Sequence, residues 1–408
     1  MNILMISHYA GTPQYGMEFR SYYMGREWVK MGHRVTIVGA SFSHLRKQQP
    51  TPGREIVDGI EYLWLPTRQY QGNGAARVIS MFQFVMQVFK HKNELVALRP
   101  DVVIASSVYT FDLYPCHYIA RRCHAKLVYE VHDLWPLSPM IIGGYSPWHP
   151  FIWLLQRGEN YAYRHSHLVV SIPDKTYPHM KRHGLPESRF CCIPNGFLLD
   201  EWENLNTLSL PPSHSQLIRQ LHSEGKIIIG FAGGHTQSTA MDILLRAAHQ
   251  LADRSNLAFV LVGQGPQKEE LQQLAQQLQL PNTYFLPPVP KNTIPLLLQH
   301  FDICYAGGVH SILHQYGTSF NKITDYMMAS RPIIFSVDEP HSLVENVGCG
   351  LQVEAENVVQ VAQAIVQLSQ LTAQQRNAMG QLGHDYACSH LNYTSLSQQF
   401  IDNINNTI

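Results

Sequence analysis

The residues best placed to do chemistry lie between Tyr316 and Ile334, a segment that is polar at first and apolar at its end. This order predicts a polar loop, a helix that begins at Asn321, and then a buried strand. Asn321 and Lys322 would stand at the helix start, where an ammonium and free N–H groups can together bind a diphosphate. Asp325 follows Lys322 by one turn, so both face the same side of the helix. We expect Asp325 to accept hydrogen bonds from a ribose diol; the alternative is an ordinary surface ion pair.

Three glycine-rich turns follow predicted strands, where a phosphate can approach backbone N–H groups at a helix start. In chain order they contain Gly11 and Gly16, Gly233 and Gly234, and Gly263 and Gly265. Each turn alone is a weak signal, because a glycine after a strand is most often just a tight turn. None forms the G-x-x-x-x-G-K-[ST] loop or the G-x-G-x-x-G dinucleotide fingerprint with its later acidic residue.

A second polar group follows a predicted strand in the first half of the chain. His132 and Asp133 come directly after residues 127–131 and could orient an acceptor or polarise its hydroxyl group. A histidine beside a strand end is also often a buried structural residue. Glu18 and Arg20 lie at the start of a predicted helix after the first glycine turn and are further candidates. The alternative is that Glu18 is an ordinary N-terminal helix charge and Arg20 its ion-pair partner.

The elements that must position these residues alternate between short Val-, Ile- and Leu-rich runs and longer helical patterns, which is typical of parallel sheets. The strands expected in the first half are residues 3–7, 35–38, 102–105, 127–131 and 168–172. After a Pro-rich connection the pattern restarts with residues 226–232, 258–262, 303–306 and 332–336. The restart predicts an α/β protein with two doubly wound Rossmann-like units and a ligand cleft between them.

The chain of 408 residues is too long for one compact core, since single domains usually stop growing near ~250–300 residues. The Pro194-Asn195-Gly196 turn and a second Pro-rich stretch place the break near residues 195–203. We expect one domain over residues 1–198 and another over 199–390. Residues 391–408 should form a C-terminal amphipathic helix; a return to the first domain is one option, and periodicity does not decide it.

Composition excludes several classes of protein. Hydrophobic residues make up 45% of the chain and no tract is of low complexity, so disorder is excluded. The seven cysteines form no C-x-x-C pair, and the 22 histidines are scattered without an H-E-x-x-H motif, so neither a disulfide framework nor a metal site is expected. The start lacks a signal peptide, and the longest near-apolar run, residues 78–89, is shorter than the ~18 residues of a membrane span. We therefore expect a cytoplasmic protein, soluble or peripheral to the membrane.

The charge is divided unevenly along the chain. Residues 1–200 carry 21 Lys and Arg against 14 Asp and Glu, a net +7, and residues 201–408 carry a net −7. A basic first half could serve an acidic acceptor, a phosphorylated lipid or an anionic membrane face. Apolar stripes flanked by cations in residues 76–91 and 145–155 would suit a membrane surface. For the charge division, the alternatives are chance and docking between the halves. For the apolar stripes, the alternative is packing in the core.

Taken together in order and spacing, these landmarks resemble the retaining glycosyltransferases of family 4, which have the GT-B fold, especially members that build bacterial surface polysaccharides. The resemblance covers nearly the whole chain and rests on residues 16–20, 32–35, 132–136, 193–196, 231–233, 262–266 and 321–327. It implies transfer of a sugar, such as an N-acetylated or deoxy hexose, from a UDP-sugar to a lipid-linked glycan intermediate. It also implies retention of anomeric configuration, no metal or cofactor, and a site at the inner face of the cytoplasmic membrane.

The resemblance further implies roles for particular residues. Asp325 would contact the donor ribose and Lys322 the diphosphate, and the loop around Val289 would read a uracil edge with its backbone. The donor-binding set implied is Gly11, Gly16, Arg20, Gly233, Gly234, Gly263, Gly265, Val289, Asn321, Lys322 and Asp325. The catalytic set implied is His132, Asp133 and Lys322.

The chain departs from the family pattern at two places. Gly317 stands eight positions before Asp325, so the first acid of the family's E-x7-E motif is missing. Gly234 and Thr239 occupy positions where many members carry Arg and Lys. These departures keep two alternatives open, a sugar-nucleotide epimerase on the same fold and a catalytically silent nucleotide-sugar-binding subunit. A nicotinamide dehydrogenase is disfavoured by the absent fingerprint, and nucleic-acid binding by the neutral overall charge.

Overall fold

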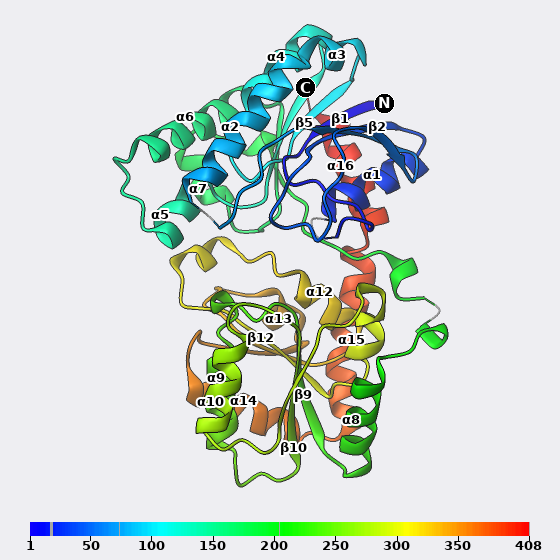
Figure 1. The fold of residues 1–408 in the computed structure, drawn as a ribbon, viewed down its shortest axis with the longest axis vertical. Coiled ribbons are helices and arrows are strands. Elements are labelled where there is room, and N and C mark those ends of the chain that lie inside the picture. The colour runs from blue at the N-terminus through cyan, green and yellow to red at the C-terminus, as the bar shows by residue number, and fades with distance from the viewer. Residues whose placement is uncertain (17–18, 73, 204, 408) are drawn as a thin grey trace. The chain divides into compact units, whose positions relative to one another are not determined.

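The computed structural model describes residues 1–16, 19–72, 74–203 and 205–407 (Figure 1). The chain forms two compact units, Met1–Asn195 together with Tyr393–Ile408 (unit 1) and Gly196–Asn392 (unit 2). The first break therefore lies three residues before the expected one, and the C-terminal segment starts at Tyr393 instead of 391. Glu18, named above as a candidate, lies outside the described residues.

Unit 1 is built on an eight-stranded sheet in the order β3-β4-β2-β1-β5-β6-β7-β8, parallel except for β3. Its strands are β1 (Asn2–Ile6), β2 (Arg34–Ala40), β3 (Gly53–Val57), β4 (Ile60–Leu65), β5 (Val102–Ala105), β6 (Lys126–Val131), β7 (Leu168–Ser171) and β8 (Phe190–Cys192). All five strands predicted for this half are present. The β3–β4 hairpin was missed, although Asp58 and Gly59 both have positive φ and form an Asp-Gly turn of the kind that joins two strands.

The helices of unit 1 include the C-terminal one. They are α1 (Arg20–Lys30), α2 (Ala75–Lys90), α3 (Lys92–Ala97), α4 (Leu113–Cys123), α5 (Leu137–Gly143), α6 (Pro150–His165), α7 (Tyr177–Arg182) and α16 (Tyr393–Asn406). The amphipathic face of α16 packs on α1, where the ring of Phe400 lies 5.2 Å from that of the fully buried Trp28. Trp28 also donates from its indole nitrogen to Ser397 O at 3.2 Å. The terminal helix therefore completes the first domain.

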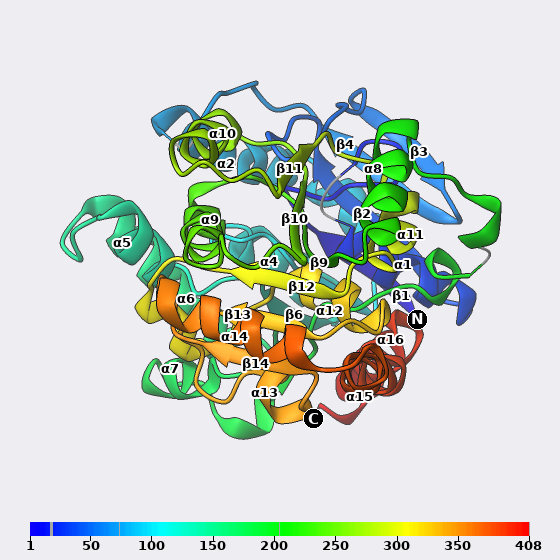
Figure 2. The same cartoon turned by 90° about the horizontal axis from the view of Figure 1, so that it is seen from below.

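Unit 2 is built on a six-stranded sheet in the order β11-β10-β9-β12-β13-β14, parallel throughout. Its strands are β9 (Ile227–Ala232), β10 (Leu257–Val262), β11 (Thr283–Leu286), β12 (Ile303–Gly307), β13 (Ile333–Ser336) and β14 (Gly350–Val353). Its helices are α8 (Pro212–Ser223), α9 (Met241–Gln250), α10 (Lys268–Gln277), α11 (Ile294–Leu298), α12 (Asn321–Met328), α13 (Leu343–Val347), α14 (Val358–Gln370) and α15 (Ala373–His390). Figure 2 shows α9 and α14 on one side of this sheet and α8 and α15 on the other. The prediction of two doubly wound α/β units is confirmed.

The strand order of each sheet points to where a ligand would bind. The order reverses beside β1 in unit 1 and beside β9 in unit 2, so helices leave the sheet in opposite directions at β1/β5 and at β9/β12. Ligands of doubly wound sheets bind outside the carboxyl ends of the strands at such a reversal. The segments after β1, β5, β9 and β12 are therefore the places to look for a site.

Within the described part of the chain, no helix combines the length and the apolar character that crossing a bilayer would require.

Candidate active site

In unit 2 the backbones of the turns after β9 and β10 lie in close contact at their glycine residues. His235 N donates to Gln264 O at 3.1 Å. A Cβ on Gly263 would lie only 1.9 Å from Gly233 O, and a Cβ on Gly265 only 2.2 Å from His235 O. Gly263 and Gly265 are therefore required by close backbone approach. We call this paired turn, residues 233–235 and 263–265, the glycine cradle.

Helix α12 begins at Asn321, as predicted, and brings Lys322 to the glycine cradle. The Lys322 ammonium lies 4.4 Å from the ring centroid of Phe231 at the end of β9, and a Cβ on Gly233 would lie 3.7 Å from it. Among the described residues the ammonium makes no hydrogen bond or ion pair, and desolvation lowers its pKa to about 8. An anion reaching the helix start would supply the missing counter-charge.

Asp325, one turn along α12, meets the loop that follows β11. Burial raises the pKa of Asp325 to about 6, the charge of Lys291 opposes that rise, and the charge of Glu201 adds to it. Lys291 follows the 288–290 loop and pairs with Glu201, with 3.1 Å between Nζ and Oε1. The side chain of Val289 is buried in the core, so its backbone is what remains for a ligand. The two segments expected at the nucleoside thus lie together in unit 2.

His235 is a site residue that sequence reasoning missed. It is fully buried, and neither ring nitrogen has a hydrogen-bond partner among the described residues. Its ring lies 5.8 Å from that of Phe231 and 6.2 Å from that of Phe285. Burial and the charges of Lys268 and Lys322 lower its pKa to about 4, so a neutral imidazole sits inside the glycine cradle. Its place directly after Gly-Gly was the only signal in the sequence.

Gly317, at the position of the missing acid, has a φ of 88°. The neighbouring Thr318 hydroxyl donates to Glu339 Oε2 at 2.6 Å. Glu339 belongs to the loop after β13 and is buried. A carboxylate from another strand end thus lies beside the position where the motif acid is absent, and it was not among the sequence candidates.

In unit 1, His132 follows β6 and is held by two side chains at the β5 and β6 ends. Its Nε2 lies 3.0 Å from Ser106 Oγ and 3.4 Å from Glu130 Oε2. Ser106 donates to the same Glu130 oxygen at 2.6 Å. Burial alone would raise the pKa of Glu130, but Arg20 and His132 bring it well below its usual range. An ionised carboxylate therefore orients the His132 ring.

Arg20 is held by several partners within unit 1. Its Nε donates to Glu130 at 3.0 Å, and its two Nη atoms donate to Ile193 O, Pro194 O and Asn195 Oδ1 at 2.8, 2.6 and 3.2 Å. The side chain is only 6% exposed. These contacts use four of the five N–H groups of the guanidinium, so Arg20 ties α1 to β6 and to the end of unit 1. Its expected contact with the donor phosphates stays a prediction.

The other sequence candidates divide between the units. Gly11, Gly16 and Asp133 belong to unit 1, where Gly16 has a φ of 76° and Asp133 is exposed. Gly234 is exposed in unit 2, and a Cβ there would meet only Thr236, at 3.6 Å. Gly234 therefore has room for a side chain, unlike Gly263 and Gly265.

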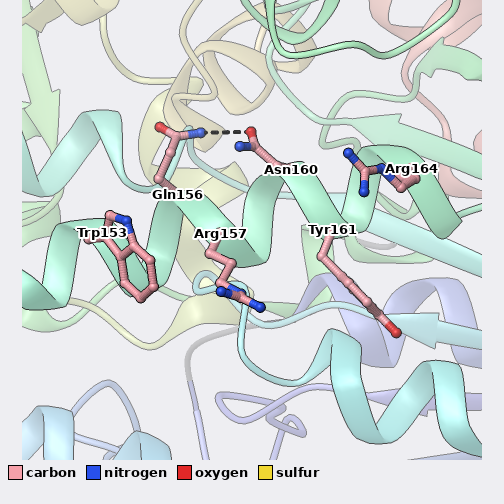
Figure 3. A pocket seen from close by; sticks show the side chains of 6 residues that line it. All are labelled: Trp153, Gln156, Arg157, Asn160, Tyr161 and Arg164. Atoms are coloured by element: carbon pink, nitrogen blue, oxygen red, sulfur yellow. Dashed lines mark hydrogen bonds between the residues drawn. The ribbon is translucent and has the colours of Figure 1, made fainter.

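A basic surface of unit 1 follows α4, α6 and α7. Three pockets of about 380, 470 and 550 Å³ share residues there, and none has an acidic residue in its lining. We call this surface the basic groove; its six arginines are Arg121, Arg122, Arg157, Arg164, Arg182 and Arg189. Figure 3 shows the first pocket, where Trp153, Arg157 and Arg164 project from α6. Part of the positive charge of the first half, six of its 21 Lys and Arg residues, thus lies along this groove.

Comparison with known proteins connects both units to one class. Residues 15–196 match the family model of a glycosyl transferase 4-like domain, and residues 226–370 match that of glycosyl transferases group 1. No curated protein matches the chain.

Solved structures share the fold over the full chain. Anabaena Alr3699/HepE in complex with UDP and glucose is 17% identical over 99% of each chain, with a TM-score of 0.68. Sucrose-phosphate synthase from Thermosynechococcus elongatus is 13% identical over 98% of this chain and 97% of its own (TM-score 0.73). WaaG, a glycosyltransferase involved in lipopolysaccharide biosynthesis, is 14% identical over 100% of each chain (TM-score 0.68). The expected two-unit α/β fold is therefore confirmed.

Proposed function

Because the chain is a glycosyltransferase with the GT-B fold, we propose that unit 2 binds a nucleoside diphosphate sugar, in the first place a UDP-sugar. One observation carries the proposal: the desolvated Lys322 ammonium lies at a helix start beside the glycine cradle without a counter-ion among the described residues. A similar protein, Alr3699/HepE, has been crystallised with UDP and with UDP-glucose.

In this proposal each part of the donor meets a different segment of unit 2. Lys322 and the first N–H groups of α12 hold the diphosphate. Asp325 accepts hydrogen bonds from the ribose hydroxyls, and the backbone around Val289 meets the base. Transfer needs stabilisation of the departing diphosphate, which preorganised cations and N–H dipoles provide, so we propose that no metal ion is required for the reaction.

We further propose that the enzyme retains the anomeric configuration, as the family resemblance implies. The acceptor hydroxyl attacks from the leaving-group side, and an oxygen of the departing diphosphate takes its proton. No protein base is then needed. His132, oriented by Glu130 and Ser106, would hold the sugar or acceptor by a hydrogen bond from its ring, with Asp133 beside it.

For the acceptor we propose a lipid-linked glycan intermediate of a surface polysaccharide, handled at the inner face of the cytoplasmic membrane. The support is the basic groove together with exposed apolar side chains on and between α5 and α6. Ile142, Trp148 and Trp153 are 76%, 92% and 57% exposed. Arginines with interfacial aromatic residues are the combination that binds anionic bilayers and phosphorylated lipids.

Binding of nucleotides tests the donor site directly. The thermal unfolding midpoint is measured with UDP, other nucleoside diphosphates and several UDP-sugars. We expect UDP compounds to stabilise the wild type and Lys322→Ala and Asp325→Ala to abolish most of that shift. Lys226→Ala is the matched control, since Lys226 precedes β9 at the amino end of the sheet. Unchanged UDP stabilisation in both site variants would refute the assignment.

The chemistry is tested by nucleotide release. With a lipid-linked acceptor supplied, a transferase liberates UDP in step with sugar transfer, whereas an epimerase leaves the nucleotide attached to its product sugar. Isomerised UDP-sugar without UDP release would contradict transfer.

A further inference from the structure

Helices α6 and α7 of unit 1 bring three metal-ligating side chains together. Glu159 lies on α6, His179 lies on α7, and His183 follows α7 directly, one turn after His179. One ligand atom from each lies within 4.8 Å of the other two. Glu159 and His179 are buried, and His183 is partly exposed. Neither the family resemblance nor the proposed donor chemistry accounts for this convergence.

The ligand atoms lie near enough for side-chain rotations to bring them around one ion. His179 Nε2 and Glu159 Oε1 form a hydrogen bond of 3.0 Å, and His183 Nδ1 lies 4.0 Å from the other carboxylate oxygen, Oε2. Ligands held about 2.0–2.1 Å from a zinc ion at tetrahedral angles are about 3.3–3.4 Å apart. A bound ion would therefore replace the His179–Glu159 hydrogen bond and draw His183 toward the carboxylate.

The hydrogen bonds around the cluster leave an acceptor in excess. The Gln156 amide nitrogen lies within 2.5–3.1 Å of Glu159 Oε2, Asn160 Oδ1 and His183 Nδ1. An amide nitrogen carries two hydrogens for these three atoms. One of the three atoms therefore receives no hydrogen from Gln156. If that atom is His183 Nδ1, either a cation takes its lone pair or the ring carries a proton on Nδ1 and donates it to Asn160 Oδ1, 3.3 Å away.

The surroundings provide an orienting group. Tyr163 donates its hydroxyl hydrogen to Glu159 Oε1 at 2.9 Å, which fixes the carboxylate.

We propose that Glu159, His179 and His183 form a binding site for one divalent transition-metal ion, for which Zn²⁺ is the best match. Two imidazoles and one carboxylate are a ligand set that zinc accepts, with water in the fourth position. The 470 Å³ pocket that includes His183 and Asn160 gives water access to that position. Its arginines, Arg164, Arg182 and Arg189, repel a cation and should weaken the affinity without changing the ligand set.

The ion would join α6 to α7 and stiffen the side of unit 1 that carries the basic groove. The proposal goes beyond the proposed function, because its three ligands belong to unit 1 and the proposed donor-binding residues Lys322 and Asp325 belong to unit 2. The test of donor binding and the test of zinc binding can therefore give different outcomes.

The test uses the full chain, stripped of metal with a chelator and then titrated with Zn²⁺ alone. We expect one tightly held Zn²⁺ per chain after gel filtration and a raised thermal unfolding midpoint. Co²⁺ in its place should give the visible absorption of a tetrahedral site. His183→Ala should lower Zn²⁺ affinity at least a hundredfold, and Tyr163→Phe, which removes only the orienting hydroxyl, about tenfold.

The control is His249→Ala, an exposed histidine of unit 2, which should retain full Zn²⁺ binding. Glu159→Gln keeps the shape of the side chain but removes its charge, and should also lose the ion. His183 is partly exposed at a helix end, so its variant tests the site even if the buried Glu159 variant does not fold. No Zn²⁺ retained by the wild type, or equal binding in wild type and His183→Ala, would overturn the proposal. UDP stabilisation measured on the same samples reports separately on the donor site.

Discussion

At the scale of single residues, the proposed donor site in unit 2 has two ionisable groups that predict a pH range for UDP binding. Desolvation lowers the pKa of Lys322 to about 8 and raises that of Asp325 to about 6. Both groups are therefore charged only between these two values. We expect UDP affinity to be highest between about pH 6 and about pH 8. It should fall below that range as Asp325 takes up a proton, and above it as Lys322 loses one.

The same shift predicts proton uptake on binding. A bound diphosphate favours the ammonium and raises the pKa of Lys322, so above about pH 8 the complex takes up a proton that the free protein lacks. Isothermal titration in buffers of different ionisation enthalpy measures this uptake. Lys291 is the other group able to take up this proton, because burial lowers its pKa to about 8 as well. Lys322→Met separates the two, because uptake that survives in this variant would assign the proton to Lys291.

Gly234 offers a further prediction at this scale, since its position has space for a side chain and lacks the cation that the family resemblance leads us to expect there. Gly234→Arg should fold normally and bind UDP several-fold more tightly, because it adds a guanidinium beside the glycine cradle. Gly263→Ala is the contrasting change: its Cβ would lie 1.9 Å from Gly233 O, so the turns must separate and UDP binding should be lost. Titration calorimetry of both variants decides the matter. Weaker binding by Gly234→Arg would place the diphosphate elsewhere.

At the scale of elements, the C-terminal helix α16 stabilises a domain that begins almost four hundred residues earlier. Phe400 packs edge-on against Trp28 of α1, and both are fully buried. Phe400→Ala should lower the free energy of unfolding by about 3–5 kcal/mol, the cost of a large cavity in a packed core. Urea denaturation followed by tryptophan fluorescence measures it. Gln399→Ala, an exposed neighbour on the same helix, should change it by less than about 0.5 kcal/mol.

At the scale of the whole molecule, the charge asymmetry follows the domain division. Unit 1 carries 21 Lys and Arg against 14 Asp and Glu, a net +7, and unit 2 carries a net −7. Six of the arginines in unit 1 line the basic groove. The excess of positive charge thus belongs to unit 1, and the six arginines of the groove are where we expect an anionic surface to dock.

Vesicle binding tests that surface. We expect the protein to co-sediment with phosphatidylglycerol vesicles but not with phosphatidylcholine vesicles, and to dissociate as salt rises from 0.05 to about 0.5 M, because screening shortens the reach of surface charges. Replacing Arg157 and Arg164 by Ser should weaken binding about thirtyfold, since each cation near such a surface contributes about 1 kcal/mol. Ser at the exposed Arg219 and Arg246 of unit 2 is the matched control. An equal loss of vesicle binding in the two double variants would show that net charge, and not the basic groove, governs binding.

The amino-acid sequence alone predicted nine of the fourteen strands in the two sheets and the start of helix α12. All nine predicted strands are present, and α12 begins at the predicted Asn321. These features follow from hydrophobic periodicity and from glycine and proline signals within a few residues, which are local properties of the chain. The resemblance to known glycosyltransferases added the class of enzyme, because it rests on the order and spacing of short motifs and not on overall sequence identity.

Only the tertiary structure decided which partners the candidate side chains have. Arg20 is expected to meet the donor, and sheet order brings its guanidinium to Glu130 and to backbone carbonyls some 170 residues away. The burial of His235 between the two glycine turns and the convergence of Glu159 with His183 could not be predicted from their local sequence. Such contacts depend on which strand ends become neighbours and which helices face each other. That is determined by packing across the whole domain, because partners distant in sequence leave no mark on the pattern of either segment.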